Sequence, residues 1–158
     1  MLSRINSSNA SNRDINGIPV IVQYVECIDA TVCHSAIVAL RNLSEDLDNK
    51  KVVGKYGLQH IATKVNWQLK IDVKIRLQIP VDPTYLQQAT SAHQRSYTSK
   101  SAVAALYLVR LLINLNHANA ELLLSTNALK AIVNINKNAQ FGDPIRKAAG
   151  QVSFWPAF

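Results

Sequence analysis

The sequence predicts an all-α protein built as an α-solenoid, in which groups of helices repeat along the chain. Apolar residues recur at spacings of three and four through most of the 158 residues, which is the pattern of amphipathic helices. Gly17 and Gly57 open similar apolar segments 40 residues apart (57 − 17), and Asn42 and Asn114 close similar helices 72 residues apart (114 − 42). A period of about 40 residues containing several helices is typical of helical-repeat solenoids. The longer separation then implies one repeat plus an insertion of about 30 residues.

The composition favours one packed unit and an acidic partner. Hydrophobic residues make up 48% of the chain, and no apolar run approaches the ~18 residues that a membrane helix needs. Residues 1–15 are too polar for a secretory signal, so we expect a cytosolic or nuclear protein. The net charge of +7 suits an acidic peptide, nucleic acid or an anionic membrane surface. Because the basic residues are scattered and aromatic residues make up only 6% of the chain, a generally basic surface is favoured over a dedicated nucleic-acid site.

The first part of the chain divides into a leader and a helical region. Residues 1–16 are rich in Ser and Asn and are predicted to be a disordered leader. Helices are predicted over residues 17–65, which would hold the first repeats. Asp29 is the expected N-cap of a long helix with an apolar stripe of Val32, Ala36, Ala39, Leu40 and Leu43. The shorter helix "NKKVVGKYG" is expected to end at Gly57, where "LQHIATKV" opens the next one.

Residues 66–99 are predicted to be an insertion that is irregular or prone to β structure. Apolar and polar residues alternate strictly in "LKIDVKIRLQI", and this period of two is typical of a strand with one buried face. A lone strand in a helical solenoid would have no pairing partner. A mobile loop is therefore the first interpretation, with a hairpin or edge strand, or an unusual reading frame or exon choice, as the open alternatives.

The last region, residues 100–158, is predicted to hold the C-terminal repeats. Residues 99–116 form the strongest predicted helix, because Ala and Leu dominate "SKSAVAALYLVRLLINLN". Shorter helices are expected in "AELLLST" and "ALKAIVNINKN". A final helix is expected to start at Asp143 and Pro144, with an N-cap, Pro in its first turn and an apolar stripe of Ile145, Ala148, Ala149 and Val152.

The junction "SAIVALRNLSEDLDNKKVVGKYG" resembles an armadillo repeat. In that repeat a long third helix ends in Ala-Leu-x-Asn-Leu and is followed by an acidic turn, an Asn-Lys pair and a glycine. Within it, "NKKVVGKY" (residues 49–56) is similar to a segment of the delta-catenin family, which includes the cadherin juxtamembrane-binding catenin and the plakophilins. The segment "NALKAIVNINKN" resembles the last repeat of the same family. The similar regions cover residues 17–65 and about 102–152, and the insertion between them does not match.

The resemblance implies an armadillo-type right-handed α-solenoid fragment that holds the last repeats of a longer domain. It also implies a non-enzymatic adaptor in cell–cell adhesion, which binds cadherin tails at adherens junctions and influences Rho-family regulators. The location would be the cytoplasm at cell–cell junctions of the plasma membrane, or the nucleus. In the family, earlier repeats hold most of the cadherin tail.

Two alternatives stay open beside this reading, a generic armadillo or HEAT interaction scaffold and a nuclear-import-type peptide adaptor. The import adaptor is less favoured because Val38 stands where related solenoids carry Trp and because the positive net charge opposes a basic cargo.

The candidate peptide groove lies along the third helices, whose polar residues face an extended peptide in such repeats. On the first long helix the candidates are Ser35, Val38 and Asn42, which share one face. Their counterparts on the next long helix are Arg110 and Asn114. Asn can donate to and accept from a peptide backbone, and Arg110 could pair with a carboxylate. The alternative is that the Asn side chains satisfy neighbouring backbone groups and that Arg110 is a solvated charge.

The remaining polar residues indicate a surface role and no catalytic or metal chemistry. Lys50, Lys51, Lys55 and Lys64 are expected on a solvated ridge, with contact to acidic partners or anionic lipid as the second possibility. Cys27 and Cys33 lack the second ligand pair that a tetrahedral metal site needs, so buried, reduced helix cysteines are expected. The chain contains no HExxH and no glycine-rich phosphate loop, so we expect no enzyme activity and no cofactor.

Overall fold

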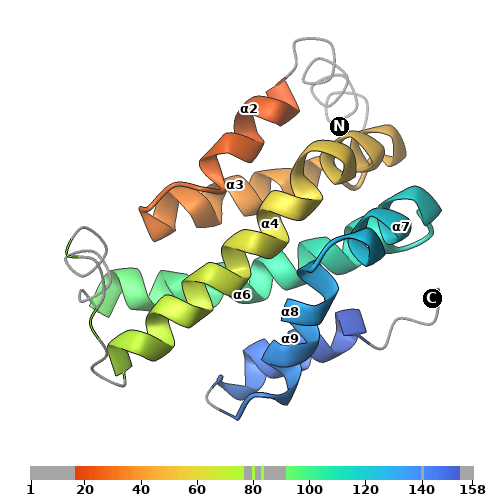
Figure 1. Cartoon of the computed structure of the whole chain (residues 1–158). Helices are drawn as coiled ribbons and strands as arrows, with labels where there is room; N and C mark the ends of the chain where they lie inside the picture. The colour runs from red at the N-terminus through yellow and green to blue at the C-terminus, as the bar shows by residue number, and fades with distance from the viewer. Residues whose placement is uncertain (1–16, 77–79, 81–82, 84–91, 140, 154–158) are drawn as a thin grey trace.

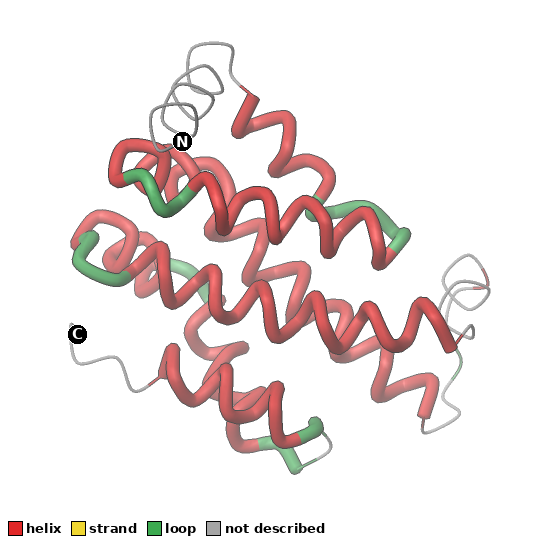
Figure 2. Tube along the Cα trace, turned by 180° about the vertical axis from the view of Figure 1, so that it is seen from behind, coloured by secondary structure: helices red, strands yellow, loops and turns green. Residues whose placement is uncertain are grey.

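The computed structural model describes residues 17–76, 80, 83, 92–139 and 141–153. Regular structure in these ranges consists of helices (Figure 1): α2 (Gly17–Tyr24), α3 (Ala30–Leu43), α4 (Leu47–Arg76), α6 (Ala92–Ile113), α7 (His117–Ser125), α8 (Ala128–Lys137) and α9 (Asp143–Ser153). Figure 2 shows no strand in the described part of the chain. The predicted all-α class is therefore confirmed, whereas the expected leader over residues 1–16 lies outside the described ranges.

The helices pack in two series. In one series α6 lies between α3 and α9, and in the other α4 lies between α2 and α8. The series are joined pairwise, because α2 packs on α3, α4 on α6 and α8 on α9. The shorter α7 contacts α4, α6 and α8 (Figure 1). The long helices α4 and α6 thus form the centre, with α2 and α3 at one end and α8 and α9 at the other.

The core lies between the two series and is made of aliphatic side chains. Burying a Leu or Ile side chain contributes roughly 1.5–3 kcal/mol, so this cluster is the main source of stability. The apolar stripes predicted from periodicity are largely confirmed, including all of Ile145, Ala148, Ala149 and Val152 on α9. Two residues of the predicted stripe on α3 are exceptions, because Val32 is 38% exposed and Ala39 is only half-buried. The largest fully buried side chains are Ile18, Ile37, Leu40, Leu58, Ile61, Leu106, Leu108, Leu112, Ile113, Leu123 and Ile132.

The capping prediction for α3 is confirmed, and two further caps are visible. Oδ1 of Asp29 accepts hydrogen bonds from the backbone N–H of Thr31 at 2.8 Å and of Val32 at 3.4 Å. Asp46 holds the start of α4 in the same way, and Asn116 caps α7 by accepting from Asn119 N–H at 3.0 Å. These side chains satisfy backbone donors that have no partner within the first helical turn.

The predicted break at Gly57 is wrong. Gly57 lies inside α4, which continues from Leu47 to Arg76. A Cβ atom at Gly57 would lie 3.1 Å from Cγ2 of Val22, so the glycine lets α2 approach α4 closely. A glycine that allows close packing of two helices has the same sequence signature as one that ends a helix.

The predicted insertion over residues 66–99 is helical at both of its ends. Helix α4 continues to Arg76 and α6 begins at Ala92, so residues 66–76 are neither a loop nor a strand. Once the first turns of α4 are packed, each further residue adds a hydrogen bond without a new nucleation step, whereas a strand here would lack a partner. Most of the sequence between the two helices, residues 77–79, 81–82 and 84–91, lies outside the described ranges.

Candidate functional site

The predicted groove residues lie on α3 and α6, which pack side by side, except Asn114, which directly follows the end of α6. Ser35 and Asn42 are exposed on α3, and Val38 is half-buried between them. The Ser35 hydroxyl donates to the Thr31 carbonyl at 2.9 Å within its own helix. Their presence on one exposed helix face is as expected, whereas their contact with a peptide stays a prediction.

The two candidates near the end of α6 already have partners within the protein. Arg110 is exposed, and its Nη1 donates to Oε1 of Gln151 on α9 at 3.0 Å. Asn114 is half-buried, and its backbone carbonyl accepts a hydrogen bond from Nζ of Lys50. Arg110 therefore links two helices of one series, and the backbone of Asn114 links α6 to α4.

A groove is present where α3, α6 and the start of α9 meet. It has a volume of about 810 Å³, and its lining includes His34, Arg41, Lys100, Val103, Tyr107 and Pro144. We call it the α3–α6–α9 groove. None of the predicted groove residues lines it, although His34 and Arg41 each lie one position before a predicted residue on α3. The helices chosen from the sequence, α3 and α6, thus border this groove, but which of their residues line it depends on how each helix is rotated.

The α3–α6–α9 groove combines an apolar floor with basic side chains. Val103, Ala104 and Ile145 contribute the aliphatic surface, and Tyr107 is 40% exposed. Arg41 and Lys100 provide positive charge, and no described lining residue is acidic. A chemically suitable ligand is therefore anionic and has an apolar part.

Tyr97 holds two of the polar lining residues in place. Its ring lies edge-on to the ring of His34, with 5.6 Å between the centroids, and Nζ of Lys100 lies 5.0 Å from its centroid. Nδ1 of His34 is buried and has no hydrogen-bond partner. An unsatisfied buried nitrogen is unfavourable, and it would be stabilised by a ligand group that reaches it.

A second hollow of about 620 Å³ shares Val103, Tyr107 and Pro144 with the first. Its other lining residues include Lys147 and Arg146, and Arg146 forms an ion pair with Asp143. Because the two hollows share a wall, they extend the same surface from α3 across α6 to α9. This length is suited to an extended segment rather than to a compact small molecule.

The predicted basic ridge is corrected by the structure, because Lys50 and Lys64 are buried. Lys50 is 6% exposed and Lys64 is 8% exposed. Nζ of Lys64 donates to the carbonyls of Cys27 at 3.0 Å and Glu26 at 3.2 Å, in the turn that follows α2. Burial lowers the pKa of Lys64, while Cys33, Cys27 and Glu26 oppose the shift, and burial lowers the pKa of Lys50 as well. A lysine that reaches the carbonyls after a helix is not distinguishable in sequence from a solvated one.

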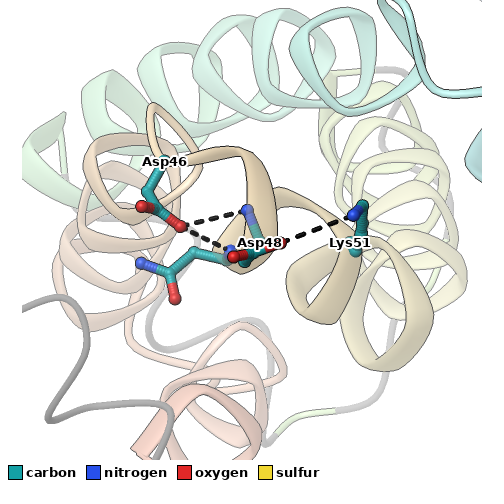
Figure 3. A network of polar contacts seen from close by, with 4 residues as sticks. Asp46, Asp48 and Lys51 are labelled. Atoms are coloured by element: carbon teal, nitrogen blue, oxygen red, sulfur yellow. Dashed lines mark hydrogen bonds and ion pairs between the residues drawn. The ribbon is translucent and has the colours of Figure 1, made fainter.

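The other two lysines are exposed, as expected. Lys51 pairs with Asp48 at 3.4 Å beside the cap formed by Asp46 (Figure 3). Lys55 lies 5.2 Å from the centroid of the Tyr56 ring. Exposed pairs of this kind contribute at most about 1 kcal/mol, so both lysines can contact a partner without loss of the fold.

Sequence reasoning missed a buried polar junction that joins α4, α6 and α7. Asn119 is 4% exposed, and its Nδ2 donates to the carbonyls of Leu112 at 2.8 Å and Lys50 at 3.3 Å. A Cβ atom at Gly54 would lie 2.0 Å from Oδ1 of Asn119, so the glycine leaves the room that this amide occupies. The sequence signal for this junction was Gly54 within "NKKVVGKY". Because this glycine has no side chain, the Asn119 amide can pack directly against α4.

The cysteines are free and play a packing role. Cys33 is buried in α3, and its Sγ donates to the Val25 carbonyl at 3.2 Å. Cys27 is half-buried and lies in the turn after α2 rather than in a helix, which corrects the expectation of two helix cysteines. The described residues contain no group of three His, Cys, Asp or Glu that could hold a metal ion. Nor does any described helix combine the length and apolar character needed to cross a membrane.

The regular structure of the described residues is all-helical, and it carries a groove that is basic and partly apolar. The chain is 28% identical over 131 residues to the splicing regulator ARVCF of Mus musculus, and equally to that of Rattus norvegicus. Each match covers 83% of this chain but only 12% of the relative, so the chain spans a small part of the length of these proteins. ARVCF is a delta-catenin family member, so the similarity gives weak support to the resemblance seen in residues 49–56. No family model matches the chain, and no solved structure matches it.

Proposed function

We propose that this chain is part of an armadillo-type right-handed α-solenoid, and that it acts as a non-enzymatic adaptor that binds cadherin tails. The observation that carries the proposal is the alignment of α3, α6 and α9, which together present one groove. In a solenoid of three-helix repeats, successive third helices lie side by side and form the binding surface. The second series, α2, α4 and α8, matches the helices that precede them in such repeats.

The similarity to ARVCF supports a cadherin-associated role over a generic scaffold. The proposed location is the cytoplasmic side of cell–cell junctions, with a further role in the nucleus. Rho-family regulators are proposed as additional partners. The nuclear-import alternative is disfavoured because the groove is lined by Arg41 and Lys100, which would repel a basic cargo.

A binding measurement with a cadherin cytoplasmic tail tests this proposal. Isothermal titration should be performed with this chain and with a longer version that carries preceding repeats. We expect weak binding by this chain and stronger binding by the longer one, because the chain covers 12% of its relatives and the resemblance assigns most of the cadherin contacts to earlier repeats. The absence of heat in both titrations at two temperatures would rule out the cadherin role, because a binding enthalpy that is zero at one temperature is not zero at the other.

A further inference from the structure

We propose that Leu47 and Leu115 form a docking surface for a basic amphipathic helix of a partner protein. These two leucines, together with the exposed side chains of Glu45 and Asp48, are called the Leu47–Leu115 surface. None of these residues lines the α3–α6–α9 groove or the adjoining hollow, so the inference goes beyond the proposed cadherin role, and either one can fail without the other.

The two leucines are the most exposed of the large hydrophobic side chains that the structure describes. Leu115 is 95% exposed in the turn between α6 and α7, and Leu47 is 72% exposed as the first residue of α4. Exposed apolar side chains that gather in one place and are rimmed by polar residues mark interaction sites. A partner that covers both leucines would remove apolar surface from water, which favours association.

Hydrogen bonds hold the two leucines at the same end of the molecule. Nζ of Lys50, one turn after Leu47, donates to the carbonyl of Asn114, the residue before Leu115. The carbonyl of Lys50 in turn accepts from Nδ2 of Asn119 on α7 at 3.3 Å. The turn between α3 and α4 and the turn between α6 and α7 therefore lie next to each other (Figures 1 and 2). Because these contacts exist before a partner binds, little ordering entropy is lost on binding.

The backbone at Leu115 indicates that its exposure has a function. Its φ of 53° lies in the left-handed region, which Leu adopts only at a cost. The almost fully exposed side chain adds little packing to offset that cost. Strained residues of this kind cluster at functional sites, so Leu115 is the main anchor of the surface.

The charges around the leucines set the requirement for a basic partner. Residues 44–51 and 114–121 contain four of the chain's ten acidic residues but only two of its 17 basic residues. The acidic ones are Glu45, Asp46, Asp48 and Glu121. Of the basic ones, Lys50 is 6% exposed and Lys51 pairs with Asp48 at 3.4 Å (Figure 3). The surface is thus locally acidic, so it attracts a basic segment and repels nucleic acid or an anionic membrane.

The geometry favours a helix as the bound segment. The part of the chain that the structure describes contains no strand, so a partner cannot add a strand to a sheet here. Two side chains that protrude from neighbouring turns can instead insert between the ridges of a helix whose apolar residues recur every three or four positions. A basic amphipathic helix combines this apolar stripe with the positive charge that the carboxylates attract.

The test uses fluorescence anisotropy with a fluorescein-labelled helical peptide of about 18 residues, made of leucine and lysine with all leucines on one face. The control peptide has the same composition, with its leucines distributed around the helix. We expect the first peptide to bind at least about tenfold more tightly, because only this peptide presents a continuous apolar stripe. The basic α3–α6–α9 groove should repel both peptides, so it is not a competing site.

Variants of the protein separate the leucines from the charges. Leu115→Asn and Leu47→Asn should each weaken binding at least about fivefold, because each removes an apolar contact. Glu45→Lys should weaken it at least about threefold by replacing an attraction with a repulsion. The matched controls are Leu124→Asn and Glu26→Lys, which make the same changes at exposed residues elsewhere and should change binding less than about twofold.

Thermal melting distinguishes a binding role of Leu115 from a structural one. Asn fits the left-handed conformation better than Leu, so Leu115→Asn should bind the peptide more weakly without melting at a lower temperature. A residue that serves only the fold would show a loss of stability instead. Melting curves of the other variants verify that each one is folded.

Four outcomes would overturn the proposal. They are no binding of the amphipathic peptide up to about 1 mM, equal binding of the two peptides, an effect of Leu115→Asn below about twofold, and a loss with Leu124→Asn or Glu26→Lys as large as that with Leu115→Asn. A cadherin tail that does not bind, together with peptide binding that is lost with Leu115→Asn, would reject the cadherin role and support the Leu47–Leu115 surface.

Discussion

Leu115 has the only positive φ among the described non-glycine residues, at 53°, in the turn between α6 and α7. Its side chain is 95% exposed, so no burial offsets the roughly 1–2 kcal/mol of the left-handed conformation. Asn adopts this conformation more readily than Leu. We expect Leu115→Asn to raise the free energy of unfolding by about 0.5–1 kcal/mol in urea denaturation.

The control for that substitution is Leu124→Asn. Leu124 is 50% exposed within the regular helix α7, so the same change there should lower stability slightly through helix propensity. A loss of stability in Leu115→Asn as large as that in Leu124→Asn would show that the turn is not strained.

Lys64 makes stability depend on pH in a predictable direction. Its pKa is lowered by burial from the ordinary value of 10.5, so between the lowered pKa and 10.5 the unfolded state binds more protons than the folded state. Stability contributed by this residue therefore rises as pH increases through that window, and it reaches its full value above 10.5. The free energy of unfolding of the native protein minus that of Lys64→Met should therefore increase from pH 8 to about 10.5. Urea denaturation at each pH measures this difference.

The measurement includes other titrating groups, and those that do not interact with Lys64 are shared by both proteins and cancel in the difference. Lys51→Met is the matched control, because it makes the same substitution at an exposed position of the same helix. Parallel pH curves for the native protein and Lys64→Met would contradict the assignment of a desolvated ammonium group.

At the scale of elements, the contact between α4 and α7 depends on Gly54. A Cβ atom there would lie 2.0 Å from Oδ1 and 2.3 Å from Nδ2 of Asn119, so Gly54→Ala must displace this amide from the Leu112 and Lys50 carbonyls. Losing buried hydrogen bonds of this kind costs about 1–3 kcal/mol. We expect Gly54→Ala to lower the free energy of unfolding by at least that amount in urea denaturation.

A double-mutant cycle identifies the cause. Asn119→Ala removes the side chain that clashes, so Gly54→Ala should be much less destabilising in that background than in the native protein. Fully additive effects of the two substitutions would show that Gly54 is required for another reason, since residues in direct contact are expected to couple.

The helices themselves were predictable to different degrees. Asp29 and the stripe on α9 follow from capping chemistry and local periodicity, and the structure has both. The alternating residues 69–76 were not predicted to be helical, because tertiary packing of the first half of α4 extends a helix through a sequence with period two. The local sequence pattern thus predicts a helix correctly where tertiary packing agrees with the pattern. The prediction fails where the preceding turns of the same helix determine the conformation.

At the scale of the whole molecule, the internal repeat explains both what could be predicted and what could not. It placed the long helices that end near Asn42 and Asn114 but missed the extent of α4, and Leu43 is 7% exposed while Leu115, 72 residues later, is 95% exposed. The difference arises because α3 continues to Leu43, whereas α6 ends at Ile113 and Asn116 caps the next helix. The lining of the α3–α6–α9 groove could not be predicted from the sequence for a similar reason. Its lining comes from residues as distant as His34 and Pro144, and their orientation depends on long-range packing.

Comparison of α2 with α4 through the 40-residue repeat identifies an exposed apolar surface on α2. Val20 and Tyr24 on α2 correspond, 40 residues earlier, to His60 and Lys64 on α4 (60 − 20 and 64 − 24). On α4 these positions contact the preceding unit, because both His60 and Lys64 bind Glu26. On α2 they are apolar, and Val20 is 50% and Tyr24 is 54% exposed. The position that is buried on α4, at Lys64, is thus exposed on α2, at Tyr24.

We therefore expect the isolated chain to self-associate through this end of α2, because burying exposed apolar side chains against a second copy is favourable. Sedimentation velocity over a concentration series should show reversible association, and the double variant Val20→Glu with Tyr24→Glu should shift the chain to monomer. Leu124→Glu is the control, because Leu124 is equally exposed but lies on α7, and this variant should associate like the native chain. A native chain that stays monomeric at every concentration, or a loss of association in Leu124→Glu equal to that in the double variant, would contradict the assignment to α2.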